Sequence, residues 1–289
     1  MTLIDSHLHL WDPRILHYGW LSDVPALNHP HLPEDLAAEG SAPDAAIVVQ
    51  ADCAANQALA EVRWINELAE HSPFQIAGIV AWAPLENGES VIPLLRQLRA
   101  MPRVVGIRRS LQNEPDTLFY DARYRAGLLA AAQEGFVLDL CVRAHQLPAV
   151  YHLLSWLFTH QPHARVVLDH MGKPGIINNT RQEWYDSFAQ LAQFPSLFCK
   201  ISGLPTEADW QTWDDEQLAP WIQHAIKSFG PYRCLFGGDW PVVNLAGGYS
   251  RWKLCVEKAI ANLPICDKHA IMGGNARNVY LQLQEGNNQ

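Results

Sequence analysis

Several features that would assign this chain to other classes of protein are absent from its sequence. No apolar run approaches the roughly 18 residues that a membrane-spanning helix needs. No basic segment followed by an apolar core stands at the N-terminus, so no secretory signal is expected. The longest basic cluster is Arg108-Arg109, and the net charge is -9. We therefore expect no nucleic-acid partner and no membrane partner.

Paired cysteines are absent as well. The six cysteines are scattered and form no CxxC pair. Three of them, Cys141, Cys199 and Cys234, lie in strand-like apolar runs, where cysteine acts as a small buried hydrophobe. The sequence thus predicts no disulfide framework and favours a reducing, cytoplasmic location.

No linker, low-complexity segment or charge block divides the chain, so we expect a single domain over residues 1–289. Eight short apolar runs recur along it instead. Most are continuously apolar, which is typical of strands covered on both faces. The runs span residues 3–10, 45–50, 75–82, 104–110, 136–142, 165–170, 197–202 and 234–240.

Amphipathic helical patterns separate these runs. They cover residues 55–70, 121–135, 182–194, 214–230, 250–262 and 267–283. Pro220 interrupts one of them, so that helix is expected to start late or to split. Eight strands alternating with helices predict a (β/α)8 TIM barrel. The alternative is an open doubly wound sheet, which the absence of a GxGxxG turn after any strand disfavours.

Ionisable residues stand at the ends of five predicted strands. In a (β/α)8 barrel the carboxyl ends of the strands form the active-site rim. A cluster of such residues at one rim indicates chemistry more than surface polarity. The groups are His7 and His9, Arg108, Asp169 and His170, Lys200, and Asp239.

His7 and His9 are two residues apart on one strand, so their side chains point the same way. With His170 and Asp239 they can converge in the barrel lumen. Two imidazoles, a third and a carboxylate suit one divalent metal, Zn or Mn. The same four residues equally suit a metal-free acid–base site with Asp239 as general base.

Each residue also has a simpler structural explanation. Asp239 can cap a turn, His170 can be a loop histidine, and Arg108 can pair with a helix carboxylate. Lys200 can extend along apolar surface at a strand end. Six further side chains are candidates for contacting a substrate. They are Arg108, Lys173, Lys200, Gln50, Trp82 and Trp240.

Five motifs together resemble the amidohydrolase superfamily and, within it, its lactonase-like branch. They are IDSHLHLWDP (4–13), VVLDHMGKP (166–174), KISGL (200–204), FGGDWPV (236–242) and GGNARNVY (273–280), and they cover essentially the whole chain in order. The resemblance implies a (β/α)8 barrel with His7 and His9 on strand one, His170 on strand six and Asp239 on strand eight. It also implies hydrolysis of lactones, such as L-fuconolactone, L-rhamnonolactone or 2-pyrone-4,6-dicarboxylate.

The sequence departs from the metal-dependent members of the superfamily at two places. Strand five reads FVLDLCVR, with no histidine at its end, and strand four shows Arg108 where two-metal members carry a bridging lysine or glutamate. A binuclear site is therefore not expected. The resemblance favours catalysis without a required cofactor, and a single metal held by His7, His9, His170 and Asp239 stays an alternative.

The favoured function is hydrolysis of a neutral sugar lactone, with a small-molecule substrate as partner. Arg108 and Arg109 are adjacent, so only one faces inward, and few arginines are left to bind a dicarboxylate. The alternatives are a metal-dependent amidohydrolase or decarboxylase on the same barrel, and a sugar-binding barrel without activity. The particular lactone and any homo-oligomeric assembly are left open.

Overall fold

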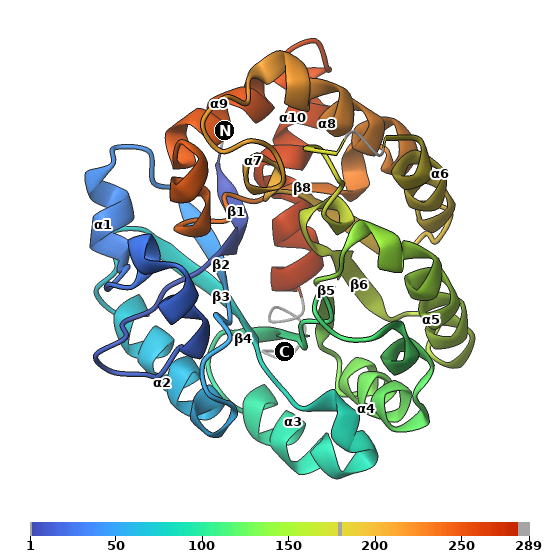
Figure 1. The fold of residues 1–289 in the computed structure, drawn as a ribbon. Helices are drawn as coiled ribbons and strands as arrows, with labels where there is room; N and C mark the ends of the chain where they lie inside the picture. Colours follow the sequence, from blue (N-terminus) through green and yellow to red (C-terminus); the bar gives the residue numbers. More distant parts are fainter. Residues whose placement is uncertain (1, 179–180, 283–289) are drawn as a thin grey trace.

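Eight parallel strands form a nearly closed barrel in the computed structural model, which describes residues 2–178 and 181–282 (Figure 1). Each strand pairs with the next along the chain, and a bridge between Leu8 and Trp240 joins the last strand region to the first. The predicted (β/α)8 barrel is confirmed. The strands are β1 (Ile4–Leu8), β2 (Ala45–Val49), β3 (Gln75–Ala81), β4 (Val104–Arg108), β5 (Val137–Leu140), β6 (Arg165–Leu168), β7 (Leu197–Ile201) and β8 (Cys234–Phe236).

Helices surround the barrel on its outer side, except that the short helix α7 lies inside this ring, near β8 (Figure 1). They are α1 (Pro33–Ala38), α2 (Ala58–Ala69), α3 (Ile92–Arg99), α4 (Ala122–Gln133), α5 (Leu147–His160), α6 (Arg181–Leu191), α7 (Leu204–Glu207), α8 (Asp215–Phe229), α9 (Tyr249–Ala259) and α10 (Ile265–His269). The helical patterns in the sequence predicted α2, α4, α6, α8, α9 and α10, but did not indicate α1, α3, α5 or α7.

Two of the predicted helices differ from expectation. Helix α8 is continuous through Pro220, so the expected late start or split is wrong. Its burial of Leu218, Trp221 and Ile222 offsets the one backbone hydrogen bond that proline removes. The pattern over 267–283 becomes α10 followed by π-helical turns at Ala270–Gly274 and Arg277–Leu281, and residue 283 lies outside the described residues.

The apolar core has two parts. The larger lies between the strands and the surrounding helices. The smaller fills the barrel interior, where Ile4 and Ala45, the first residues of β1 and β2, pack in the same cluster as Val279 and Tyr280. The C-terminal turns therefore close the barrel at the amino ends of the strands, and the opposite end is left for a site.

Two further expectations can be compared with the structure. Cys141, Cys199 and Cys234 are buried free thiols, as predicted. Within the described residues, no helix has both the length and the apolar character needed to span a bilayer.

One acid is buried beneath the loop that follows β2. Glu61 of α2 accepts hydrogen bonds through Oε1 from the Ala51 N–H, at 3.1 Å, and from the Tyr18 hydroxyl, at 3.3 Å. Its Oε2 has no partner among the described residues. Burial raises the pKa of Glu61 to about 7, because the ionised form loses its hydration.

The variant Glu61→Gln tests this burial. The pKa is higher in the folded state, so the contribution of Glu61 to stability is fully present below pH 4.5 and falls by about 3 kcal/mol as the pH rises towards 7. Glutamine does not ionise. We therefore expect the stability of the variant relative to wild type to increase by about 1–3 kcal/mol between pH 4.5 and pH 8, measured by denaturant unfolding. A difference that does not change with pH would contradict the raised pKa.

Candidate active site

A bulge in β1 aims the two N-terminal imidazoles into the lumen. The register of β1 against β2 shifts between Asp5 and Leu8. Ile4 and His7 therefore both face inward, although they stand three positions apart, a spacing that puts side chains on opposite faces of a regular strand. Asp5 fixes this bend, because its Oδ1 accepts the N–H groups of His7, at 2.8 Å, and of Gly238, at 2.9 Å. The strand end is thereby tied to the loop after β8.

The other two members of the site stand in strained backbone at the ends of β6 and β8. His170 and Asp239 both have a positive φ, 51° and 55°, in the left-handed region that non-glycine residues rarely adopt. Such strain is concentrated at functional sites. Gly203 lies against the His170 ring, where an added Cβ would be 2.6 Å from Nδ1, so a side chain there would displace the imidazole.

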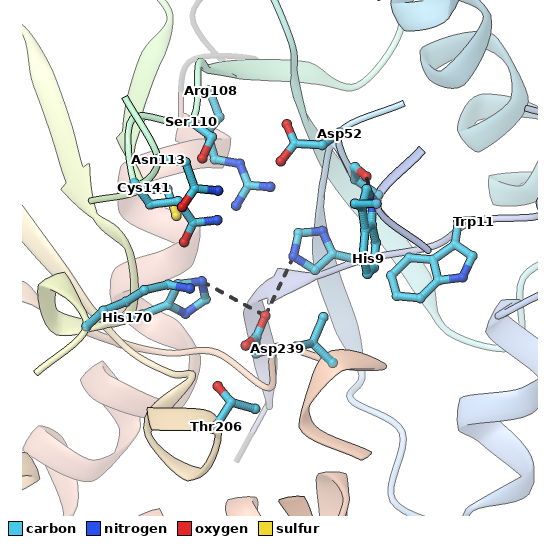
Figure 2. Close-up of a pocket in the computed structure, with 15 residues that line it drawn as sticks. His9, Trp11, Asp52, Arg108, Ser110, Asn113, Cys141, His170, Thr206 and Asp239 are labelled. Carbon is cyan, nitrogen blue, oxygen red and sulfur yellow. Dashed lines mark hydrogen bonds and ion pairs between the residues drawn. The ribbon is translucent and has the colours of Figure 1, made fainter. Parts of the chain in front are cut away.

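The four side chains converge on one point, and Figure 2 shows His9, His170 and Asp239 around it. Asp239 Oδ1 lies 3.8, 3.6 and 4.0 Å from the Nε2 atoms of His7, His9 and His170. The Nε2 atoms of His7 and His9 are 3.1 Å apart. The separations from the carboxylate exceed hydrogen-bonding distance, so they suit an atom shared between the groups, such as a water oxygen or a metal ion.

A cavity of about 270 Å³ opens above this point. That volume lies just below the usual range for ligand pockets, about 300–1,000 Å³, and suits a ligand of roughly monosaccharide size. Polar and aromatic side chains from several strand ends and loops form its wall (Figure 2). The lining residues are His9, Trp11, Trp20, Ala51, Asp52, Arg108, Ser110, Gln112, Asn113, Cys141, His170, Lys173, Thr206, Asp239 and Val242.

Beneath the cavity lies a buried network of charges. The Lys200 ammonium is 2.5 Å from Asp139 Oδ2, 2.9 Å from Asp169 Oδ1 and 3.1 Å from His7 Nδ1. Arg108 NH1 lies 3.4 Å from the other oxygen of Asp169, and Arg108 NH2 donates to the Gln50 carbonyl at 2.7 Å. Two cations and two carboxylates thus neutralise one another where water does not reach.

This network accounts for the protonation of its members. Burial raises the pKa of Asp139 to about 6. Burial acts in the same direction on Asp169, but Lys200, His7 and Arg108 outweigh it and hold the pKa of that carboxyl well below its usual range. Burial lowers the pKa of His170 to about 4. Burial also lowers the pKa of His7 well below its usual value, so both imidazoles are neutral at pH 7.

The Asp239 carboxyl group is ionised at pH 7. Its burial favours the neutral acid, but the neighbouring imidazoles of His170, His9 and His7 outweigh that effect and keep its pKa below the ordinary value. At neutral pH the site therefore holds the Asp239 carboxylate beside the neutral imidazoles of His7 and His170, which makes it a proton acceptor with hydrogen-bonding neighbours.

The structure brings together the predicted catalytic set. Of the predicted substrate contacts, some line the cavity and others lie away from it. Arg108 and Lys173 line the cavity. Lys200 has no exposed surface, since its two carboxylate partners hold it beneath the cavity, and the buried Gln50 lies behind the wall. Trp240 points away and donates its indole N–H to Glu39 at 2.8 Å, and Trp82 is not among the lining residues.

Sequence reasoning missed several lining residues, because they stand on loops without periodic pattern. Asp52 follows β2 and is not part of any motif. Ser110, Gln112 and Asn113 come after β4, and Thr206 lies in the short helix α7. Asp52 and Ser110 could have been recognised from one signal in the sequence, a polar residue at or shortly after the end of a predicted strand.

The residues fit one metal ion but not two. The Nε2 atoms of His7 and His9 and Asp239 Oδ1, separated by 3.1, 3.8 and 3.6 Å, share a point about 2 Å from each, the length of zinc–imidazole and zinc–carboxylate bonds. A second set, His7, Asp169 and His170, is already in contact with the cations Lys200 and Arg108. Their charge opposes a second divalent ion.

The fold and the site define an amidohydrolase. The model of the amidohydrolase family matches residues 4–281, and the chain belongs to that family of hydrolases. It is 32% identical over 292 residues to an L-fucono-1,5-lactonase from Burkholderia multivorans, an alignment that covers 96% of this chain and 95% of the relative.

Solved structures agree with the family. Crystal structures of an amidohydrolase from Burkholderia multivorans, one with bound HEPES and one with bound zinc, match with a TM-score of 0.85 and 31% identity over 97% of this chain and 99% of theirs. A probable 2-pyrone-4,6-dicarboxylic acid hydrolase from Acinetobacter baumannii shares the fold, with a TM-score of 0.74 and 16% identity over 96% of this chain and 99% of its own.

The variant Lys200→Met tests the buried network. Removing the ammonium leaves Asp139 and Asp169 buried without their shared cation, and we expect a loss of about 3–5 kcal/mol in the free energy of unfolding. Adding Asp139→Asn removes one stranded charge, so the double variant should be more stable than Lys200→Met alone. Denaturant unfolding measures both.

The matched control is Lys258→Met. Lys258 pairs with Asp215 at 2.6 Å, but on the exposed surface, where such a pair contributes at most about 1 kcal/mol. Equal losses for the two lysine variants would contradict the role of Lys200 in the network.

Proposed function

We propose that this protein hydrolyses the ring ester of a small neutral sugar lactone, an aldonolactone such as L-fuconolactone or L-rhamnonolactone. The observation that carries the proposal is the ionised Asp239 carboxylate held among three imidazoles at the floor of a cavity of monosaccharide size. The similarity to an L-fucono-1,5-lactonase along nearly the whole chain supports the same substrate class.

In this mechanism Asp239 is the general base. Its carboxylate takes a proton from a water molecule as the water oxygen attacks the lactone carbonyl. The bond between the carbonyl carbon and the ring oxygen then breaks, and the protonated Asp239 returns the proton to that oxygen. The product is an open-chain hydroxy acid, and the carboxylate is ready for the next turnover.

His170 and Arg108 stabilise the negative charge that develops on the carbonyl oxygen. The Ser202 hydroxyl lies 2.9 Å from His170 Nδ1, and donation from that hydroxyl leaves Nε2–H facing the cavity as a donor. The Arg108 guanidinium lines the same cavity. Loss of one such donor costs about 3 kcal/mol in the transition state.

The charges around the site favour a neutral lactone over a dicarboxylate. Arg109, next to the inward-facing Arg108, bonds to Glu86 and Glu114 instead of the cavity. Arg143 binds the carbonyl of Gln112 and the side chain of Asn113 on its exposed side. One arginine therefore reaches the cavity, whereas two carboxylates would require several.

A metal-dependent amidohydrolase is the second candidate, and the geometry of His7, His9 and Asp239 favours it. These residues, with His170 beside them, would hold one Zn or Mn ion, which polarises a carbonyl or lowers the pKa of bound water. Asp169 Oδ1, 3.3 Å from His7 Nδ1, and the Val49 carbonyl, 2.8 Å from His9 Nδ1, would orient the two ligands. We favour catalysis without a required metal, because the end of strand β5 carries no histidine and its Asp139 is already paired with Lys200.

Asp239→Asn tests the general base. The amide keeps the shape of the side chain but accepts no proton, so we expect kcat for an aldonolactone to fall by about 100-fold or more. A pH-indicator assay over a panel of aldonolactones measures it, with the exposed Asp23→Asn as control. Near-normal turnover by Asp239→Asn would remove Asp239 from the mechanism.

Chelation separates the two candidates. If no metal is required, protein dialysed against a chelator and shown metal-free by elemental analysis keeps its lactone turnover. Loss of turnover on chelation, restored by Zn or Mn, would favour the metal-dependent enzyme. Failure to hydrolyse any lactone, with or without metal, would contradict the proposed function.

A further inference from the structure

We infer that Asp52 determines the substrate specificity of this cavity, by accepting hydrogen bonds from the hydroxyl groups of a lactone and by repelling lactones that carry a carboxylate. The inference rests on the proposed function and names a residue outside the catalytic set. Asp52 lines the cavity on the side opposite Asp239 (Figure 2).

Asp52 is held in place before any ligand arrives. The buried Gln50 clasps it at two points, since Gln50 Nε2 donates to Asp52 Oδ1 at 3.1 Å and Gln50 Oε1 accepts the Asp52 N–H at 2.6 Å. Asp52 has a positive φ of 54°, a strained conformation that persists at functional sites when the surroundings enforce it. An exposed acid held in this way loses little freedom on binding.

The Asp52 carboxylate adds to the field that stabilises the Arg108 guanidinium, but unlike the cations of the cavity it has no close ion-pair partner among the described residues. Arg108 and Lys173, the two lysine or arginine side chains among the lining residues, lie 3.4 Å from Asp169 and 3.6 Å from Glu207. Asp52 forms no ion pair within residues 2–178 and 181–282. A ligand in the cavity therefore meets the Asp52 carboxylate, which no close cation neutralises, as well as the Asp239 carboxylate, and an anionic ligand is repelled.

A second acceptor stands in the same wall. Gln112 lines the cavity, and its buried Oε1 has no hydrogen-bond partner among the described residues. A buried acceptor without a partner is costly, and a hydroxyl donor from a ligand would remove that cost. The Asp52 carboxylate accepts from hydroxyls but repels a ligand carboxylate, so it selects for a polyhydroxylated, uncharged ring, and Gln112 Oε1 offers a second acceptor to the hydroxyl groups.

The test compares three lactones and two variants. The lactones are a neutral aldonolactone, δ-valerolactone, which lacks hydroxyl groups, and glucaro-1,4-lactone, which carries a carboxylate. For Asp52→Asn we expect kcat/KM for the aldonolactone to fall about 10-fold or more through KM, as for loss of a hydrogen bond to a charged group. The δ-valerolactone rate should stay within about 2-fold, and the glucaro-lactone rate should rise.

Asp52→Glu separates charge from position. It keeps the negative charge but moves the carboxylate, so aldonolactone turnover should fall while glucaro-lactone stays a poor substrate. The exposed Asp23→Asn is the matched control and should leave all three rates unchanged. Equal ratios of the three rates in wild type and Asp52→Asn, or a wild type that prefers glucaro-lactone, would overturn the inference.

Equilibrium binding of a neutral aldonolactam, measured by calorimetry, tests Asp52 without turnover. Binding that weakens about 10-fold in Asp52→Asn supports the inference even if no lactone is hydrolysed, and that combination would reject only the proposed function. Lactam binding of equal strength in both proteins would overturn the role of Asp52.

Discussion

The arrangement of the site depends on neutralising charge inside the barrel. Lys200 carries its ammonium into the lumen, where it contacts Asp139, Asp169 and His7, and Arg108 completes the balance through Asp169. A single ion in this position would be too costly to bury, whereas the four-membered set is stable as a unit. His7 thus rests on a rigid polar support, and its ring is directed at Asp239 from below.

Above that support, the carboxyl ends of the strands supply the reacting groups and the loops supply the wall. The bend of β1 around Asp5 brings His7 and His9 to one face, and strained backbone presents His170 and Asp239. The strands position a common set of chemical groups, and the loops adjust what fits over it. This division explains how one barrel architecture accommodates different substrates.

The sequence predicted the barrel and the convergence of His7, His9, His170 and Asp239, since strand ends in a closed barrel share one rim. It did not predict which polar side chains line the cavity and which lie buried beneath it. Lys200 was expected to contact the substrate, but the structure buries it in the lumen, where it pairs with Asp139 of β5. Nor did it predict Asp52, whose position depends on a clasp by the Gln50 side chain that no periodicity encodes.

The C-terminal turns link the far end of the barrel to this chemistry. The Tyr280 hydroxyl donates to Asp139 Oδ1 at 2.7 Å, and Tyr280 packs in the lumen beside Val279 and Ile4. A ribosome adds Tyr280 after every strand of the barrel has been made. Asp139 lacks this donor until Tyr280 has been synthesised, so the buried network beneath the site is completed only after all eight strands of the barrel have been made.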